Sequence, residues 1–412
     1  MNQAVYVYAD WEDLAGPTRV GVLQADQIKG REHFRFAYDP DWLQATHVQQ
    51  IDPDLALYAG EQHRAAARNF RVFLDSCPDR WGRLLMQRRE AALARQQARR
   101  PRRLCEMDYL LGVHDTHRMG ALRFKREPDG AFLDDNVQLA VPPLTSLAEL
   151  AYAAQQVEDT RRQDDPDYML WLHRLISPGS SLGGARPKAC VRDPQGCLWI
   201  AKFPSRYDDY DIGAWEFVVY QLALQAGIQM SACRLESFGG PYHTFLTQRF
   251  DRSAQQRRHF SSALTQLGYD DGDYEASYLE LAQFLTDQGA ATRADLAQLW
   301  RRMVFHIAVS NTDDHLRNHG FICEQRGWVL APAYDINPTA AAAGLHLNIS
   351  DVDNALDFDL ALSVTDFFQL SRQQAEQIQA EVLRSVREWR HVASQVGLSR
   401  AEQAAMATAF RV

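Results

Sequence analysis

The 412-residue sequence is poor in cysteine and lacks long apolar runs. Its six cysteines are scattered without a C-x-x-C pair, which argues against a disulfide framework or a cysteine-based zinc site and is typical of a reducing compartment. No apolar run approaches membrane-spanning length, and the N-terminus has no basic region followed by an apolar core. The sequence therefore predicts a cytoplasmic protein with no membrane partner.

Basic residues are also too few to dominate the surface charge. The formal net charge is −9 and the pI about 5.8, which argues against wholesale coating of nucleic acid or of an anionic membrane. With 46% apolar and 24% charged residues, the chain should be a folded protein of two or three domains. One local basic patch, Arg88 to Arg103, is either a solvated helix face or a contact for a partner or nucleic acid.

The first hundred residues predict a small β-rich module followed by a helix. Residues 5–8, 19–23 and 34–38 are β-rich, which is typical of an antiparallel sheet. The segment from Asp75 to Gly82 offers helix-capping residues, so a helix should begin near Pro78 and continue to Pro101.

A glycine-rich segment from Ser177 to Lys188 precedes two strand-like runs, 189–191 and 198–203. Taken alone, it fits either a tight hairpin turn or a loop whose backbone N–H groups approach a phosphate. Lys202 favours the second interpretation, because a glycine-rich loop with a lysine on a following strand is the nucleotide-holding arrangement of a kinase. Glu216 is either a partner for this lysine or an ordinary exposed helix carboxylate.

Apolar residues recur at helical spacing from Leu296 to Ile307, and Thr292 with Asp295 is a plausible capping pair for this helix. The helix leads into a polar run, 310–320, in which Asp313 and Asn318 are five positions apart. This is the spacing between the base and the metal-holding amide in the catalytic loop of protein kinases. Downstream, Asp335 follows an apolar run and could bind magnesium, as the Asp of D-F-G does.

Five segments together resemble the HipA family of bacterial serine/threonine kinase toxins. They are residues 181–188 (SLGGARPK), 201–204 (AKFP), 248–252 (QRFDR), 311–318 (NTDDHLRN) and 334–336 (YDI). The resemblance implies an α+β fold, bilobed and protein-kinase-like, with an N-terminal β-rich subdomain and a largely α-helical C-terminal lobe. We expect the subdomain with its basic helix at 1–107, the N-lobe at 108–250 and the catalytic C-lobe at 251–412.

The resemblance also implies an ATP- and Mg²⁺-dependent serine/threonine protein kinase with Asp313 as its base. Asn318 and Asp335 would hold magnesium, and Ser181 would be autophosphorylated. The remaining residues implied to contact ATP are Gly183, Gly184, Ala185, Arg186, Pro187, Lys188, Lys202, Gln248, Arg249, Phe250, His315 and Tyr334, together with Asn318 and Asp335. Gln248 departs from the acidic residue that commonly opens the hinge motif of the family.

By the same resemblance, the expected partners are a protein substrate and a helix-turn-helix antitoxin that binds operator DNA. Aminoacyl-tRNA synthetases are among the targets of the family. One alternative is a regulatory binding protein that acts through the antitoxin–DNA complex with weak or lost catalysis. Another takes Asp314 and His315 as ligands of a metal phosphohydrolase, for which His306 is a further candidate ligand or, alternatively, a core histidine.

Overall fold

The computed structural model describes residues 2–45, 48–64, 69–136, 141–176, 184–253, 256–272 and 275–412. The chain forms two compact units. The first comprises Met1–Arg206 and Asp251–Ser261, and the second comprises Tyr207–Phe250 and Ser262–Val412. One crossing between them, after Phe250, coincides with a boundary expected from the sequence. The three-segment division itself stays a prediction.

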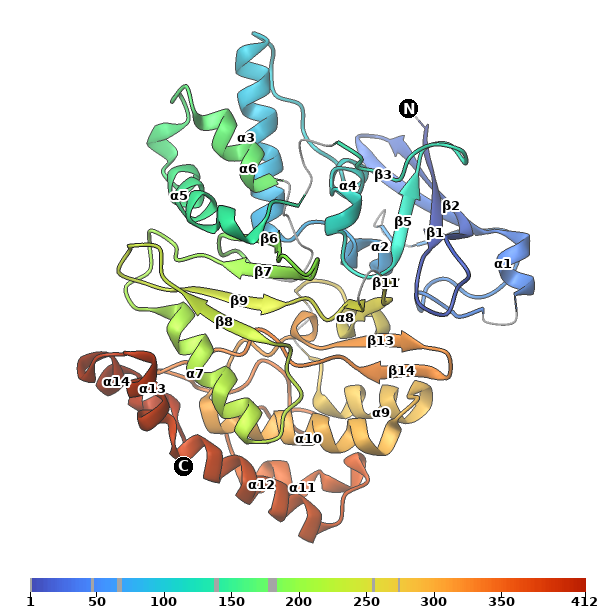
Figure 1. Ribbon diagram of the computed structural model, residues 1–412. Helices are drawn as coiled ribbons and strands as arrows, with labels where there is room; N and C mark the ends of the chain where they lie inside the picture. The colour runs from blue at the N-terminus through green and yellow to red at the C-terminus, as the bar shows by residue number, and fades with distance from the viewer. Residues whose placement is uncertain are drawn as a thin grey trace. The chain divides into compact units, whose positions relative to one another are not determined.

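The N-terminal sheet of the first unit has five antiparallel strands in the order β4-β3-β2-β1-β5, which confirms the predicted β-rich module (Figure 1). Alternate residues along its strands are buried, as period-2 side chains on a one-sided sheet require. The buried face includes Val5 on β1, Leu23 on β2 and Phe36 on β3, and β1 and β2 pair Val5 with Leu23. The strands are β1 (Asn2–Ala9), β2 (Thr18–Ile28), β3 (Arg31–Tyr38), β4 (Glu61–His63) and β5 (Leu122–Lys125).

Helices of the first unit include α3 (Arg80–Gln96), which lies beside α6 in the ribbon of Figure 1. The side chain of Asp79 caps α3 by accepting a hydrogen bond from the Gly82 N–H at 2.8 Å, so the predicted helix begins where its capping residue indicates. The other helices are α1 (Pro40–Gln44), α2 (Arg71–Asp75), α4 (Glu106–Leu111), α5 (Leu147–Glu158) and α6 (Tyr168–Ile176).

The two predicted strand-like runs after the glycine-rich segment are strands β6 (Lys188–Arg192) and β7 (Leu198–Lys202), and the structure pairs them as an antiparallel hairpin. Cys190 pairs with Ile200, and Lys188 lies opposite Lys202 at the open end. A shorter pair, β10 (Arg252–Ser253) and β11 (Gln256–Arg257), also belongs to the first unit.

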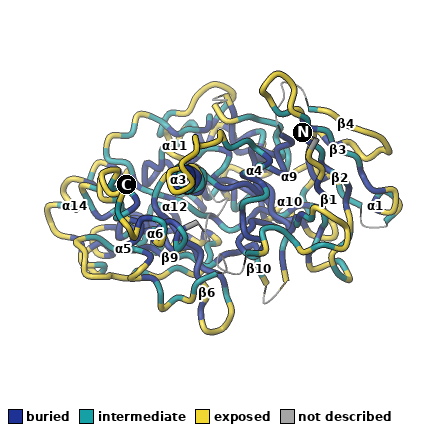
Figure 2. The backbone as a smooth tube through the Cα atoms, turned by 90° about the horizontal axis from the view of Figure 1, so that it is seen from above, coloured by how far each residue is buried: buried dark blue, intermediate teal, exposed yellow. Residues whose placement is uncertain are grey.

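The second unit is largely helical, with two antiparallel hairpins, β8–β9 and β13–β14. Its longest helix is α10 (Thr292–Val309), and every residue of α10 from Arg302 to Val309 is buried (Figure 2). The remaining elements are α7 (Ile212–Gln225), β8 (Cys233–Glu236), β9 (Thr244–Gln248), α8 (Ala263–Gln266), α9 (Tyr278–Gln288), β13 (Gly320–Glu324), β14 (Gly327–Leu330), α11 (Phe358–Ser363), α12 (Arg372–Arg387), α13 (Trp389–Val396) and α14 (Arg400–Met406). β12 (Phe260–Ser262) lies at the last crossing between the units.

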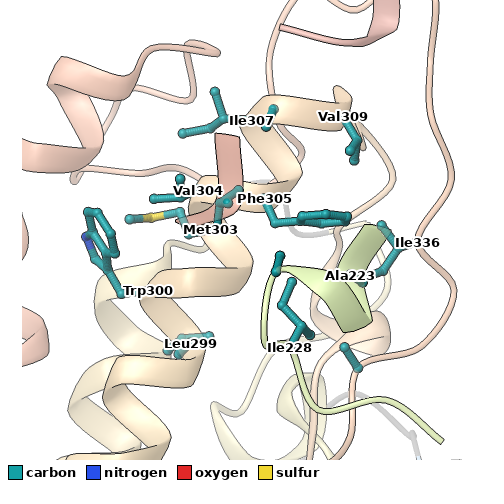
Figure 3. Close-up of a cluster of buried hydrophobic side chains, with 14 of the residues drawn as sticks. Ala223, Ile228, Leu299, Trp300, Met303, Val304, Phe305, Ile307, Val309 and Ile336 are labelled. Atoms are coloured by element: carbon teal, nitrogen blue, oxygen red, sulfur yellow. The ribbon is translucent and has the colours of Figure 1, made fainter. Parts of the chain in front are cut away.

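The apolar side chains of α10 pack into the core of the second unit. Figure 3 shows Phe305 and Val309 in one cluster of buried side chains with Ile336, which follows β14, and with Ala223 of α7. All four side chains are almost fully buried. This packing fixes the end of α10, and with it the polar segment that follows, against the segment that carries Asp335.

The predicted capping pair at the start of α10 is wrong. Ala291 is the N-cap residue, and no side chain caps the helix there. The Thr292 hydroxyl donates instead to the Leu285 carbonyl at 3.0 Å, and Asp295 accepts from the Leu330 N–H at 3.0 Å. The two side chains that the T-x-x-D pattern predicts as capping groups therefore form hydrogen bonds with the backbone of α9 and β14 instead.

Candidate active site

The candidate catalytic loop, Asn311–Asn318, starts where α10 ends. Ser310 has φ +51° and closes the helix in the left-handed conformation, with its N–H bonded to the Ile307 carbonyl. The Arg411 guanidinium donates to the Ser310 hydroxyl at 3.1 Å. The loop thus leaves the helix in a defined direction, although serine has no glycine-like freedom at this φ.

Asp313 and Asn318, the two ends of the D-x-x-x-x-N spacing, meet in space. The Asn318 side-chain amide donates to the backbone carbonyl of Asp313 at 2.7 Å. Its Oδ1 is buried and has no hydrogen-bond partner among the described residues. The Asp313 side chain is 76% exposed, so its carboxylate is open to a reactant. The spacing therefore places an accessible carboxylate beside an amide oxygen that lacks a ligand.

Asp335 lies in the segment after β14, next to this pair. It has φ +58°, a conformation that residues other than glycine adopt at a cost and that is found at functional sites. Two hydrogen bonds hold its surroundings to the catalytic loop: the Asn337 N–H donates to Asn311 Oδ1 at 3.3 Å, and the Tyr334 hydroxyl donates to the Arg317 carbonyl at 2.7 Å.

The two carboxylates act on each other electrostatically. Partial desolvation raises the pKa of Asp313 above its ordinary value, and the charge of Asp335 adds to this, while His315 opposes it. His315 Nε2 lies 3.8 Å from Asp313 Oδ1. Like charges that raise a carboxyl pKa are typical of sites that bind a cation.

These groups fit magnesium. The Asn318 amide oxygen and the carboxylates of Asp313 and Asp335 are hard oxygen ligands, and the first is a buried acceptor still without a partner among the described residues. The predicted magnesium ligands, Asn318 and Asp335, are thus brought to one place in the second unit, and their role stays a prediction.

Behind the catalytic loop lies a buried polar cluster, of which the sequence indicated only His306 and Asp314. The Tyr278 hydroxyl contacts Asp314 Oδ2 at 2.5 Å and His306 Nδ1 at 2.8 Å, and the His346 N–H donates to Asp314 Oδ1 at 2.7 Å. Burial alone would raise the pKa of Asp314, but interactions with His306 and Tyr278 lower it. Tyr278 and His346 are far from Asp314 in sequence, so no local pattern could have identified them.

The predicted hinge residues lie at the end of β9, which includes Gln248, and directly after it in the second unit. Gln248 donates its backbone N–H to the Ala232 carbonyl at 2.8 Å, and Arg249 is buried. The rings of Phe250 and Tyr334, both implied to contact ATP, lie 5.5 Å apart at 30°. Their roles as adenine contacts stay predictions.

The predicted phosphate-binding segment belongs to the first unit, and Ser181 and Gly183 lie outside the described residues. Gly184 has φ +93°, and a Cβ there would lie 3.2 Å from the Lys188 ammonium. Ala185 is exposed, while Arg186 and Pro187 lead into β6. Lys188 has a partner that the sequence did not indicate: its Nζ lies 2.9 Å from Oδ2 of Asp79, and both side chains are only 3% exposed.

The basic patch on and after α3 is largely paired within the first unit. Arg88 donates to the Val157 carbonyl, Arg95 to the Gln163 carbonyl, and Arg99 and Arg102 bind Glu90 and Asp108, respectively. These contacts favour the interpretation as a solvated helix face. In the part of the chain that the structure describes, no helix has both the length and the apolarity needed to cross a membrane.

Residues 180–390 match a family model described as the HipA-like C-terminal domain. A Haemophilus influenzae protein named "Putative kinase" is 26% identical over 181 residues, which cover 38% of this chain and 52% of that protein. "Putative kinase Y4dM" of Sinorhizobium fredii is 27% identical over 158 residues, covering 35% of this chain and 38% of that protein. The chain thus matches about half or less of the length of these curated relatives.

Among solved structures, the chain resembles HipA of Shewanella oneidensis MR-1, determined in a toxin–antitoxin complex of HipA, HipB and operator DNA. The TM-score is 0.63 at 17% sequence identity, over 98% of this chain and 94% of that chain. At this identity the likeness establishes the fold alone, and it confirms the predicted α+β class.

Proposed function

The chain belongs to the HipA family, and from this premise we propose that it is an ATP- and Mg²⁺-dependent serine/threonine protein kinase. The observation that carries the proposal is the assembly of Asp313, Asn318 and Asp335 in the second unit. An exposed carboxylate, a buried amide oxygen without a partner among the described residues and a second carboxylate in a strained backbone conformation meet there. The curated relatives named as kinases support the same activity.

In the proposed reaction, Asp313 orients the substrate hydroxyl and accepts its proton. Its exposure leaves room for a protein substrate, and its raised pKa makes it a somewhat stronger base than an ordinary aspartate. Asn318 and Asp335 would hold magnesium, which neutralises charge on the ATP phosphates when bound. The hydrogen bond from the Asn318 side chain to the Asp313 carbonyl fixes the position of the metal-holding amide relative to the base.

The residues of the glycine-rich segment and Lys202 are proposed to bind the ATP phosphates, and Gln248 and Phe250 to contact adenine. Autophosphorylation of Ser181 is part of the proposal. A phosphate on Ser181 would add close to two negative charges to the segment proposed to bind the ATP phosphates. Repulsion between these charges and ATP would switch the kinase off. Mass spectrometry after incubation with Mg-ATP tests this, because active protein without phosphate on Ser181 would contradict it.

The proposed partners are a DNA-binding antitoxin, operator DNA bound through that antitoxin, and a cytosolic protein substrate such as an aminoacyl-tRNA synthetase. The Shewanella protein was determined with HipB and operator DNA, which supports the first two. Co-purification with a neighbouring small DNA-binding protein, followed by operator-DNA binding of the complex, would test this part.

The decisive experiment compares Asp313→Asn with Asp351→Asn, which removes an exposed carboxylate elsewhere in the second unit. Purified variants are incubated with labelled ATP and a host lysate. We expect Asp313→Asn to lower phosphoryl transfer by about 10²–10⁴-fold, because it removes the base. Its melting temperature and ATP affinity should stay near those of the wild type, and Asp351→Asn should transfer normally. Near-normal transfer by Asp313→Asn would refute the assignment of the base.

A further inference from the structure

The buried polar cluster behind the catalytic loop contains three side chains with metal-binding donor atoms. His306 comes from the last turn of α10, Asp314 from the middle of the loop, and His319 from the residue before β13. They are 4%, 0% and 1% exposed. One ligand atom of each lies within 4.8 Å of those of the other two.

The histidines of this cluster have unused nitrogens. Neither ring nitrogen of His319 has a hydrogen-bond partner among the described residues, and the same holds for Nε2 of His306. Leaving buried polar atoms unpaired is costly, so such atoms in a folded core indicate a place for a ligand. His319 is surrounded instead by rings, with the centroids of Tyr278 and His306 at 5.5 and 5.8 Å.

Tyr278 orients two of the three side chains. The Tyr278 hydroxyl has one proton. Because an ionised carboxylate can only accept, the hydroxyl donates this proton in its 2.5 Å hydrogen bond to Asp314 Oδ2. The hydroxyl oxygen then accepts from His306 Nδ1 at 2.8 Å, which leaves the lone pair of His306 on Nε2. A hydrogen bond that fixes the tautomer of a histidine in this way is characteristic of the residues that surround metal ligands.

Hydrogen bonds among His306, Asp314 and His319 do not use all of their donor and acceptor atoms. His306 Nδ1 and Asp314 Oδ2 are 3.8 Å apart, beyond hydrogen-bond distance. Each Asp314 oxygen accepts one hydrogen bond, from Tyr278 or from the His346 N–H, and each can take a further ligand. The positive charge of the buried Arg302 guanidinium acts electrostatically at His319 and disfavours a second positive charge there. The negative charge of the Asp314 carboxylate offsets this repulsion.

We propose that His306, Asp314 and His319 bind a transition-metal ion of the zinc class, with water in the remaining position. Two imidazoles and one carboxylate suit zinc, whereas magnesium prefers ligands made only of oxygen. Ligand atoms around tetrahedral zinc are about 3.3 Å apart, so the side chains close inward by small rotations on binding. The ion ties the end of α10 to the loop and to the start of β13, next to Asp313 and Asn318. Zinc binding at this cluster does not require kinase activity.

The test uses untagged full-length protein, because a histidine tag would itself bind zinc. Elemental analysis of protein loaded with zinc and then dialysed should give about one zinc per chain. Cobalt in its place should give the visible absorption of a tetrahedral site, and X-ray absorption at the zinc edge should show two imidazoles. A large excess of Mg²⁺ should not displace the zinc.

Three variants locate the site: His306→Gln, Asp314→Asn and His319→Gln. Each should weaken zinc affinity by at least about tenfold, since each removes one of three protein ligands. The matched control is His391→Gln, which removes an exposed histidine on α13 and should bind zinc normally. Wild-type protein that retains no zinc or cobalt, or an absorption-edge spectrum without two imidazoles, would overturn the proposal. Zinc binding that survives all three substitutions would do the same. The spectra of wild-type protein decide the matter even if a variant does not fold.

Discussion

Replacing Lys188 by methionine should destabilise the first unit strongly. Its ammonium lies 2.9 Å from Asp79 Oδ2, and both side chains are 3% exposed, so solvent scarcely screens the pair. Removing one partner of a buried ion pair costs about 3–5 kcal/mol in the free energy of unfolding. The other carboxylate oxygen of Asp79 caps α3, so the damage extends to the start of that helix.

A double-mutant cycle separates the ion pair from the cap. Asp79→Asn retains an oxygen that can accept from the Gly82 N–H, so its cost should come mainly from the loss of the carboxylate charge beside Lys188. Because the two residues are in direct contact, their effects should not add. The double variant should lose about 2–3 kcal/mol less stability than the sum of the losses in the two single variants. Calorimetry is the suitable assay, because two compact units can unfold in separate transitions.

Lys29→Met, at an exposed turn of the same unit, is the control and should change stability by less than about 0.5 kcal/mol. If Lys188→Met changed stability as little as this control, the buried pair would not exist as described. Measuring each variant with and without Mg-ATP distinguishes this structural role from the phosphate contact that the family resemblance implies, because only loss of that contact reduces the stabilisation by ATP.

Three further predictions concern other sites. Lys202→Ala should reduce both phosphoryl transfer and the thermal shift produced by Mg-ATP, and an unchanged shift would place the nucleotide elsewhere. Asp335→Asn should weaken magnesium-dependent ATP binding, measured by magnesium titration of that shift, and an unaltered titration would remove Asp335 from the metal site. Burial lowers the pKa of His259, which stacks on Trp11, to about 4. The unfolded chain, with a histidine pKa of about 6.5, takes up this proton first, so about 3 kcal/mol of stability should be lost as pH falls from about 6.5 to 4. His259→Phe should flatten this part of the stability profile, and an unchanged profile would show that another group controls it.

Sequence patterns predicted those parts of the molecule that depend on neighbouring residues. The period-2 strands, the helix after Asp79 and the meeting of Asp313 with Asn318 are of this kind, because each follows from local periodicity, capping or loop length. The roles of Asp313 and Asn318 in catalysis came from the family resemblance and stay predictions.

The parts that the sequence could not predict are contacts between distant segments. The partner of Lys188 is the cap of a helix early in the chain, and Thr292 and Asp295 bond to α9 and β14 instead of capping α10. The sequence leaves two interpretations of His306: a metal ligand, because it lies near Asp314 in the chain, or a core histidine, because it lies on a mainly apolar helix. Only the fold shows that Tyr278 holds one of its nitrogens.

The catalytic loop presents opposite environments at consecutive residues. The Asp313 side chain is 76% exposed, while Asp314 is fully buried and accepts hydrogen bonds from Tyr278 and the His346 backbone. At the end of the loop both Asn318 and His319 are buried, but Asn318 reaches back to Asp313, whereas His319 lies beside the rings of Tyr278 and His306. The loop thus presents the exposed carboxylate of Asp313 on one side, with Asn318 bonded to the Asp313 backbone carbonyl, and places Asp314 and His319 in the buried cluster behind it. Because one short loop carries both Asp313 and Asp314, the hydrogen bonds that fix the buried Asp314 also restrict the position of the exposed Asp313. The loop therefore needs few contacts on the side where a substrate must approach.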